Sequence, residues 1–480
     1  MKASLFLAID QGGHASRALL FDEAGNVVGR GIQPVHSQEP HPGWVEQDPQ
    51  EMVRTVTACI EQALAGQELR AVTAAGLATQ RSSIVCWRRD NGEPLSPIIS
   101  WQDRRARDWI ESFVPQQGQV QISTGLRLSP HYGASKLRWC LDHLPAVRDA
   151  HVRGDLCFGP LASFLIYHLT LEHSFLVDPA NAARTLLYSL KTRDWDPGLL
   201  QLFGIPLAPL PRCVPTRHGF GNLLIGGRSI PLRVVTGDQS AALFAWGVPQ
   251  TEFAYVNIGT GAFVQRPCGT RPQYHQRLLS GIVLAEHGSG SYVLEGTVNG
   301  AGSALQWVQR ELGLADIDNH LVEWLASERD PTLFLNGIGG LGAPFWVTDF
   351  TSRFIGPGSA RQKAVGIAES IVFLVYENIQ EMGGSAPPLE RVVASGGLAR
   401  LDGLCQRLAD ICRLPLYRPA EQEATARGIA YLLGDPSREW AEPECGASFQ
   451  PTANAPLDER HRLWRAAMDQ ALEPRQSSTW

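Results

Sequence analysis

The sequence predicts an α/β protein, because short apolar strands alternate with amphipathic helices along the whole chain. The chain opens with the apolar run Ser4–Asp10, a glycine-containing turn and a second apolar run. The same order returns at Phe253–Ile258, where Gly259-Thr260-Gly261 forms the turn. Although the two segments share no evident identity, the repeated order indicates two related halves that meet near residues 247–252.

Length and composition limit the class of protein. The 480 residues allow two or three domains, and 44% hydrophobic with 19% charged residues argues against disorder. The net charge of −6 offers no basic surface for nucleic acid. No apolar run reaches the roughly 18 residues of a membrane span, and we expect a cytoplasmic protein. The 9 cysteines are scattered without a CxxC pair, which disfavours a disulfide framework or a zinc site.

The elements of the first half follow from hydrophobic periodicity and turn residues. A strand meander opens the chain, Asp22 to Asn26 forms a turn, and the remaining elements alternate between strands and helices. The predicted strands are Ser4–Asp10, Ala18–Phe21, a strand from Val27, Val72–Ala78, Ser83–Trp87 and Leu232–Val235, and the predicted helices are Met52–Ala65, Leu137–Leu144, Leu161–Leu169 and Ser240–Trp246.

The second half repeats this alternation. Gly313 ends one helix, and a long helix from Gln362 to about Met382 has its apolar residues on one face. The predicted strands are Phe253–Ile258, Ala262–Gln265 and Arg391–Ala394, and the further helices are Ala301–Leu312, Leu401–Cys412, Ala424–Leu433 and Leu457–Leu472. We therefore predict domains over residues 1–247 and 248–435, with a C-terminal tail and closing helix over 436–480.

Three glycine-rich turns follow predicted strands. Gly12-Gly13 comes after Asp10, Gly259-Thr260-Gly261 opens the second half, and Ser395-Gly396-Gly397 precedes a helix. Glycines let backbone N–H groups approach an anion, and an acidic residue at a strand end can hold a metal that bridges phosphates. Each turn alone is more simply a structural turn, but together they indicate a nucleotide held between two domains.

Three other side chains have a functional and a structural interpretation. Asp238 follows a buried strand, where its carboxylate could take a proton from a substrate hydroxyl or cap the next helix. Arg81 at a strand end could fix a polar ligand or form a surface salt bridge. Trp101 could wall a ligand site or pack in a core. The sequence leaves these alternatives open.

These residues lie in motifs that resemble the FGGY carbohydrate kinases and, within them, the glycerol kinases. The motifs are AIDQGGHASRALLFD, HPGWVEQDP, TQRSSIVCW, WQDRR, GDQSAALFA, GTGAF, GLGAPFW and ASGGLAR, and they follow the family's order. The resemblance runs from the N-terminus to about residue 472. The resemblance implies two actin-like, ribonuclease-H-like domains with ATP in the cleft. It also implies Mg²⁺-dependent phosphorylation of a hydroxyl of glycerol or a related small polyol or sugar, with homodimers or homotetramers common.

The resemblance also assigns roles to individual residues. Asp238 matches the catalytic base and contacts the acceptor, and Asp10 matches a carboxylate of the magnesium site. The residues expected to contact the nucleotide are Gly12, Gly13, His14, Arg17, Thr260, Gly261, Gly302, Gln306 and Gly397. The residues expected to line the acceptor site are Arg81, Ser82, Trp101, His131, Gln239 and Phe263.

Several positions depart from the glycerol kinase pattern. Gly13-His14 stands where two threonines are usual, and Ser82 replaces a glutamate that accepts a glycerol hydroxyl. His131 replaces a tyrosine, and Leu401 replaces an asparagine. A changed hydroxyl acceptor should change which polyol fits, so a pentulose or other sugar kinase is one alternative. A pseudokinase with a regulatory binding role is another.

Overall fold

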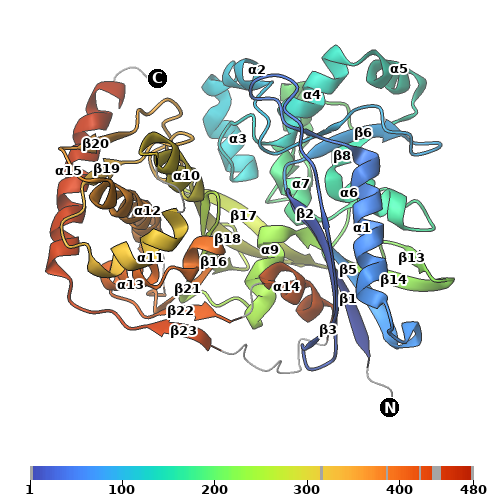
Figure 1. Ribbon diagram of the computed structural model, residues 1–480. Helices are drawn as coiled ribbons and strands as arrows, with labels where there is room; N and C mark the ends of the chain where they lie inside the picture. The colour runs from blue at the N-terminus through green and yellow to red at the C-terminus, as the bar shows by residue number, and fades with distance from the viewer. Residues whose placement is uncertain (1–3, 314–316, 385–386, 421–422, 435–444, 477–480) are drawn as a thin grey trace.

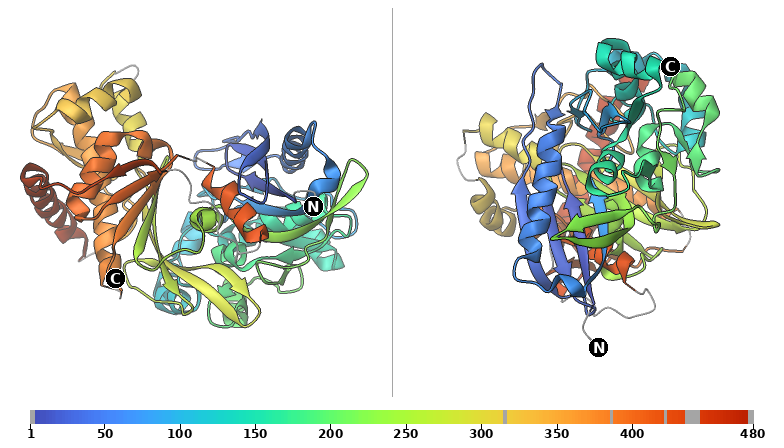
Figure 2. Two further views of the ribbon diagram at one scale, coloured as in Figure 1. Left: turned by 90° about the horizontal axis from the view of Figure 1, so that it is seen from below. Right: turned by 90° about the vertical axis from the view of Figure 1, so that its right-hand side faces the viewer.

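The computed structural model describes residues 4–313, 317–384, 387–420, 423–434 and 445–476. It has two parts, each built on a large β-sheet with helices packed against it (Figures 1 and 2). We call residues up to 247 the first half and the following residues the second half. The predicted α/β class with two actin-like domains is confirmed.

The first sheet has six strands in the order β13-β14-β5-β1-β2-β3. Strands β1 to β3 form the predicted antiparallel meander, and β5 and β14 run parallel to β1. Parallel neighbours place their carboxyl ends at one edge of the sheet. The strands are β1 (Leu5–Gln11), β2 (Ala15–Phe21), β3 (Val27–Pro34), β5 (Val72–Thr79), β13 (Asn222–Ile225) and β14 (Arg228–Gly237).

The second sheet has seven strands in the order β17-β18-β16-β15-β21-β22-β23. Its run β18-β16-β15-β21-β22 repeats the directions of β3-β2-β1-β5-β14, so the two halves share a sheet order. The ribbon of β17 and β18 was not anticipated from the sequence. The strands are β15 (Phe253–Ile258), β16 (Ala262–Gly269), β17 (Leu279–Glu286), β18 (Ser289–Val298), β21 (Arg391–Ser395), β22 (Leu416–Pro419) and β23 (Cys445–Phe449).

Smaller sheets and the helices complete the two halves. The four-stranded sheet β4-β7-β6-β8 lies under the helices at the upper right of Figure 1. The short strands are β4 (Glu46–Gln47), β6 (Ile84–Arg88), β7 (Ile98–Ile99), β8 (Leu156–Pro160), β9 (Leu176–Val177), β10 (Tyr188–Ser189), β11 (Asp194–Trp195), β12 (Arg212–Cys213), β19 (Leu333–Leu335) and β20 (Arg353–Ile355). The α-helices are α1 (Pro49–Leu64), α2 (Arg107–Glu111), α3 (Gln117–Thr124), α4 (Gly133–His143), α5 (Pro145–Arg153), α6 (Leu161–Leu169), α7 (Pro179–Ala182), α8 (Pro197–Phe203), α9 (Asp238–Ala242), α10 (Gly302–Glu311), α11 (Ile317–Ser327), α12 (Ala360–Gly383), α13 (Asp402–Cys412), α14 (Ala424–Leu433) and α15 (Ala455–Gln476). Short 3₁₀ turns are η1 (Leu69–Ala71), η2 (Val114–Gln116), η3 (Ala183–Thr185), η4 (Leu243–Trp246) and η5 (Gly397–Arg400).

Helix α1 illustrates how local sequence sets the packing. Asp48 caps it by accepting from the backbone N–H groups of Gln50 and Glu51, and Pro49 occupies the first turn. Two glycines of β3 face this helix. A Cβ at Gly31 would lie 2.0 Å from the carbonyl oxygen of Cys59, so only glycine lets the helix lie this close to the strand.

Helix α14 packs against the first sheet although it lies late in the chain. Its residues Ala426 and Ile429 share a core with Ala8, Ala78 and Val234. In Figures 1 and 2 the helix lies beside the blue strands of the first half. The boundaries at 247 and 435 stay a prediction, but the chain returns to the first half before it ends.

The C-terminal segment belongs to the second half. Strand β23 pairs with β22 at the sheet edge. Trp464 of α15 is fully buried in the core of the second half, and its indole N–H donates to the Phe334 carbonyl at 3.0 Å. The described part of the tail is therefore an integral layer of the second half. Among the described residues, no helix is both long and apolar enough to cross a membrane.

Candidate active site

The first sheet brings three predicted site residues to one edge. In the register of the sheet, Asp10 of β1 and Thr236 of β14 both lie opposite Ala78 of β5. The three strands are parallel and end together, so Asp10, Arg81 and Asp238 emerge at neighbouring positions. An apolar run that ends in a polar residue was the sequence signal for this edge.

Asp238 does not cap helix α9, so that structural interpretation was wrong. Gly237 occupies the N-cap position, and no side chain among the described residues caps the helix. The Asp238 carboxylate accepts from the Gln239 N–H at 2.7 Å and lies 3.7 Å from the Arg81 Nε. Burial raises the pKa of Asp238, and Arg81 opposes that rise. A carboxylate with a raised pKa is a stronger proton acceptor.

Arg81 is not a surface salt bridge either, because its side chain is only 9% exposed. Its Nη2 lies 3.3 Å from Glu295, which is fully buried on β18 of the second half. Glu295 also contacts Arg184 at 2.8 Å and accepts from the Gln265 Nε2 at 3.0 Å. The two arginines hold the pKa of Glu295 below its usual value despite its burial. This buried network joins the two halves at the site.

A second ion-pair chain surrounds Asp10. Arg17 on the neighbouring strand lies 3.6 Å from Asp10 and 3.7 Å from Glu423, which precedes α14. Arg30 also contacts Glu423, at 3.5 Å. Burial raises the pKa of Asp10 to about 7, against the attraction of Arg17. The carboxylate is thus held where an added positive charge would stabilise its ionised form.

Two of the expected acceptor-site residues, Trp101 and His131, contact each other. The Trp101 and His131 rings meet edge to face with their centroids 5.4 Å apart. A Cβ at Gly13 would lie 3.7 Å from the Trp101 indole nitrogen, so the first glycine turn borders this wall. Ser82 follows Arg81 with a positive φ of 66°. Trp101 is half-buried and lines this region instead of filling a core.

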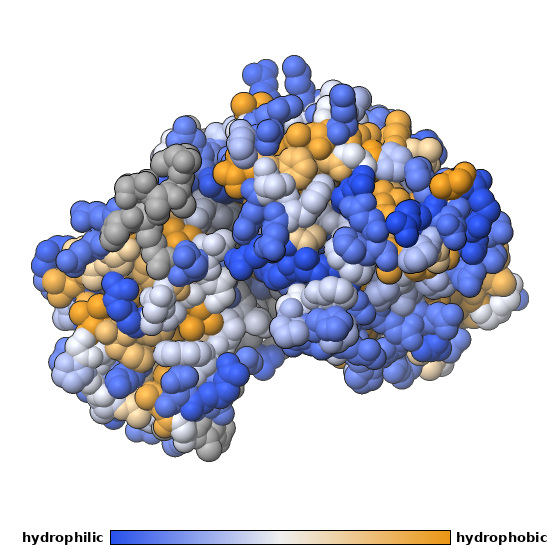
Figure 3. All heavy atoms as spheres, turned by 90° about the horizontal axis from the view of Figure 1, so that it is seen from above, coloured by the Kyte–Doolittle hydropathy of each residue, from blue (hydrophilic) through white to orange (hydrophobic). Residues whose placement is uncertain are grey.

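The nucleotide-side residues gather in the second half. Gly259-Thr260-Gly261 links β15 to β16, and the Gly259 carbonyl accepts from the N–H of Gly302, where α10 begins. Gln306 is exposed on that helix, and Gly397 begins η5 with open space around it. Phe263, which was predicted to line the acceptor site, lies in the same half, on β16 opposite Asn257. A small cavity joins this region to the first half through Gln239, and its other lining residues include Trp246, Tyr255, Asn257 and Ser395. From above, the surface is hollowed between the two parts, and hydrophilic side chains gather there (Figure 3).

The glycine turns use some of the backbone donors expected for phosphate. The Gly12 N–H donates to the Ala15 carbonyl at 2.9 Å, and the Gly302 N–H donates to Gly259 at 2.9 Å. The first bond closes the turn between β1 and β2, and the second joins the turn after β15 to the start of α10. The backbone requires glycine at position 396, because its φ is +90° and a Cβ there would lie 2.6 Å from the Ile258 carbonyl oxygen.

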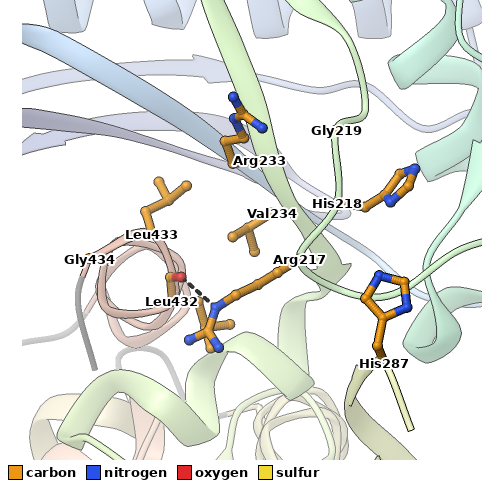
Figure 4. Close-up of a pocket in the computed structure, with 9 residues that line it drawn as sticks. All are labelled: Arg217, His218, Gly219, Arg233, Val234, His287, Leu432, Leu433 and Gly434. Carbon is orange, nitrogen blue, oxygen red and sulfur yellow. Dashed lines mark hydrogen bonds between the residues drawn. The ribbon is translucent and has the colours of Figure 1, made fainter. Parts of the chain in front are cut away.

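A cavity of about 520 Å³ lies away from these residues (Figure 4). Arg217 forms an isolated antiparallel β-bridge with Val234 of β14. Its Nε donates to the Leu432 carbonyl at 2.9 Å. His218 follows Arg217, and Arg233 precedes Val234. The side chains of His218 and Arg233 point away from that of Arg217 (Figure 4). The basic groups therefore do not converge on one ligand.

The sequence did not indicate Glu295, Arg184 or Glu423. It also did not indicate Lys136, whose buried amino group donates to the Ser82 and His131 carbonyls. Glu295 interrupts the apolar run YVLEGTV, and a carboxylate in a buried strand needs a partner. That signal could have marked it. Its partner Arg81 lies 214 residues earlier, so the pairing itself was not readable. The roles of all site residues stay predictions.

Comparison with known proteins agrees with the geometry. A chain named glycerol kinase from Citrifermentans bemidjiense is 36% identical, covering 97% of this chain and 98% of that protein. One from Thermus brockianus is 37% identical with the same coverage. Among solved structures, Plasmodium falciparum glycerol kinase with ADP superposes with a TM-score of 0.87 at 22% identity, covering 98% of both chains. Xylulose kinase from Lactobacillus acidophilus gives 0.83 at 20% identity, covering 99% and 98%.

Family models match almost the whole chain. The N-terminal domain model of the FGGY carbohydrate kinases matches residues 5–245, and the C-terminal domain model matches residues 254–434. Both models fall on the halves whose sheets repeat one strand order. The chain belongs to the FGGY family of carbohydrate kinases, which are phosphotransferases with an alcohol group as acceptor.

Proposed function

We propose that this kinase transfers the γ-phosphoryl group of ATP to a hydroxyl of glycerol or a related small polyol or sugar. The single observation that carries the proposal is the position of Asp238. It lies at the end of a buried parallel strand, 3.7 Å from Arg81, on the side where the glycine turns of the second half approach. The near full-length similarity to proteins named glycerol kinase supports the acceptor class.

Asp238 accepts the proton of the attacking hydroxyl. Its pKa is raised by burial, which makes its carboxylate a better base than an exposed aspartate. Arg81, whose guanidinium is shared between Asp238 and Glu295, orients both the carboxylate and the acceptor. Closure of the two halves excludes water from the reacting groups and so limits hydrolysis of ATP.

The nucleotide lies across the two glycine turns. In the first half, Gly12, Gly13, His14 and Arg17 are the expected phosphate contacts, and His14 is exposed at the tip of its turn. The second-half contacts are those assigned by the resemblance, namely Thr260, Gly261, Gly302, Gln306 and Gly397. Arg17 leaves its contacts with Asp10 and Glu423 to balance phosphate charge.

Magnesium fits beside Asp10. Protein sites for Mg²⁺ use one or two carboxylates and complete the shell with water and phosphate oxygens. Asp10 is 7% exposed with its pKa near 7, so a nearby cation would stabilise its charged form. Within the described ranges no group of three or more metal-ligating side chains occurs, which suits a metal brought in with ATP. When bound, the ion would neutralise charge on the phosphates.

A coupled assay of ADP release tests the proposal. It should give saturable turnover with glycerol or another small polyol, dependent on Mg²⁺. Absence of turnover with every polyol, ketose and sugar acid tried, in protein shown to bind ATP, would refute it and favour the pseudokinase alternative. A higher kcat/KM for a pentulose than for any three- or four-carbon acceptor would select the sugar kinase alternative, which the changes at Ser82 and His131 favour.

A further inference from the structure

Four polar side chains lie buried between the first glycine turn and Trp101. They are Gln11, Gln47, Gln80 and Ser83, and none of them is more than 3% exposed. Gln11 ends β1, Gln47 ends β4, and the other two lie between β5 and β6, so separate segments of the chain meet here. Buried amides and hydroxyls need hydrogen-bond partners. Their partners therefore show which parts of the site this cluster holds.

Two of these glutamines hold the first glycine turn. The Gln47 Nε2 donates to the Gly13 carbonyl at 2.9 Å, and the Gln11 Nε2 donates to the Gly12 carbonyl at 2.6 Å. Glycine has no Cβ to restrict its backbone, so two adjacent glycines can adopt many conformations. The bonds from the two glutamines therefore favour one conformation of the turn that we expect to contact the phosphates.

Gln80 joins this turn to the acceptor side. Its Nε2 donates to the Oε1 of Gln47 at 3.0 Å and to the Oε1 of Gln11 at 3.2 Å. Its Oε1 accepts from the Ser83 hydroxyl at 3.0 Å, and that hydroxyl oxygen accepts from the backbone N–H of Trp101 at 3.1 Å. A continuous chain of hydrogen bonds thus runs from the glycine turn through the glutamines and the serine to Trp101. We call it the amide chain.

Each hydrogen bond of the amide chain fixes the direction of the next one. A side-chain amide has two hydrogens to donate, and its oxygen only accepts. The Gln80 amide gives its hydrogens to two glutamine oxygens, so its own oxygen is left for Ser83. Gln47 gives its second hydrogen to the Ser37 hydroxyl at 3.1 Å. Among the described residues, none of the four side chains has a buried polar atom without a partner. A fully satisfied buried network is rigid and favours one arrangement.

We propose that Gln47 and Gln80 are positioning residues, which fix the first glycine turn relative to the acceptor site. The inference rests on the kinase function proposed above, because the amide chain joins the expected phosphate turn to the expected acceptor wall at Trp101. In-line transfer requires the attacking hydroxyl and the γ-phosphorus to be close and aligned, and a displacement of about 1 Å can lower the rate by about 10²-fold. Both glutamines are buried, so they act through the turn and Trp101 and not by contacting a reactant.

The test compares phosphoryl transfer with ATP hydrolysis in Gln80→Met and Gln47→Met. Methionine is unbranched and adaptable but has none of the hydrogen-bonding groups of an amide. Phosphorylated acceptor is quantified with glycerol, or with the acceptor that turns over best in the assay above, and phosphate release is measured without acceptor. Transfer needs both ends of the amide chain aligned, whereas hydrolysis needs only the phosphate end. We expect kcat for transfer to fall by about 10–10²-fold, and the ratio of transfer to hydrolysis to fall at least about tenfold.

Gln406→Met is the matched control. Gln406 lies on α13 and donates to Asp410 at 2.7 Å and to the Gln450 carbonyl at 2.9 Å, so the variant also loses side-chain hydrogen bonds, but outside the site. It should keep the wild-type ratio of transfer to hydrolysis. Ser83→Ala, which deletes one oxygen of the amide chain, decides where a glutamine variant fails to fold, as thermal unfolding shows.

The outcomes separate this inference from the kinase function. An unchanged ratio in the folded variants of the amide chain, or an equal change in Gln406→Met, overturns the positioning role and leaves the kinase assignment intact. Absence of turnover in the wild type with all acceptors overturns the kinase assignment itself.

Discussion

We expect Glu295, in the second half, to influence the basicity of Asp238, although burial is the largest cause of its raised pKa. It is fully buried and contacts Arg81 at 3.3 Å and Arg184 at 2.8 Å, while Arg81 also lies 3.7 Å from Asp238. The repulsion of Glu295 raises the pKa of Asp238, and the attraction of Arg81 lowers it. Replacing Glu295 with glutamine removes the repulsion and leaves Arg81 to pair with Asp238 alone. Both changes lower the pKa of Asp238.

The size of the effect follows from the contacts. At an effective dielectric constant of about 20, a pair of charges near 4 Å apart interacts by roughly 4 kcal/mol before desolvation is considered. Removing one partner of a buried ion pair costs about 3–5 kcal/mol of stability. If about 1.4 kcal/mol of the change falls on Asp238, its pKa drops by about one unit. A weaker base also lowers kcat.

The assay is a pH profile of kcat/KM for the acceptor, measured together with thermal unfolding. A base with a raised pKa loses activity as the pH falls through that pKa, so the acidic limb of Glu295→Gln should move to lower pH. Glu286→Gln is the matched control, since Glu286 pairs with Arg217 at 3.0 Å outside the site. If the limb of folded Glu295→Gln stays in place, or if the control shifts equally, Glu295 does not tune Asp238. Glu295→Asp, which keeps the charge, serves if the glutamine variant fails to fold.

Two other outcomes are expected. The raised pKa of Asp10, about 7, means that its charged form is lost as the pH falls through 7, and activity should fall with it. Because magnesium competes with that proton, a tenfold increase in Mg²⁺ should move the limb to lower pH, and a limb independent of Mg²⁺ would argue against a metal at Asp10. Gly396→Ala should destabilise the protein by about 1–3 kcal/mol, because its φ is +90° and its Cβ would meet the Ile258 carbonyl. Gly397→Ala, with open space around it, should change the unfolding temperature little, and equal effects would contradict the steric reasoning.

Local signals in the sequence predicted much of the fold. The opening meander, α1 and the strand before Asp238 were identified because apolar periodicity and turn residues are local properties. The same signals located Asp10 and Asp238 at strand ends, where the sheet register brings them to one edge. The sequence therefore predicted the edge of the sheet on which the candidate site is built.

Features that depend on distant contacts could not be read in this way. Glu295 meets Arg81 only because β18 of the second half lies against the first half. Helix α14 looks like any amphipathic helix of the second half, yet Ala426 and Ile429 pack on the first sheet. Lys136 sits in a helix where a lysine usually faces solvent, but it is buried behind Ser82. In each case the partner is set by the sheet arrangement of both halves.

We propose that Asp238 removes the proton from the acceptor hydroxyl, and one substitution tests this role directly. Asp238→Asn keeps the size of the side chain and an oxygen for the Gln239 N–H, so the fold should persist. Turnover in the ADP-release assay should fall by about 10²–10⁴-fold. The Kd for ATP, measured by calorimetry, should stay within about threefold, because we expect Asp238 to contact the acceptor and not the nucleotide. Turnover within tenfold of the wild type would contradict the account.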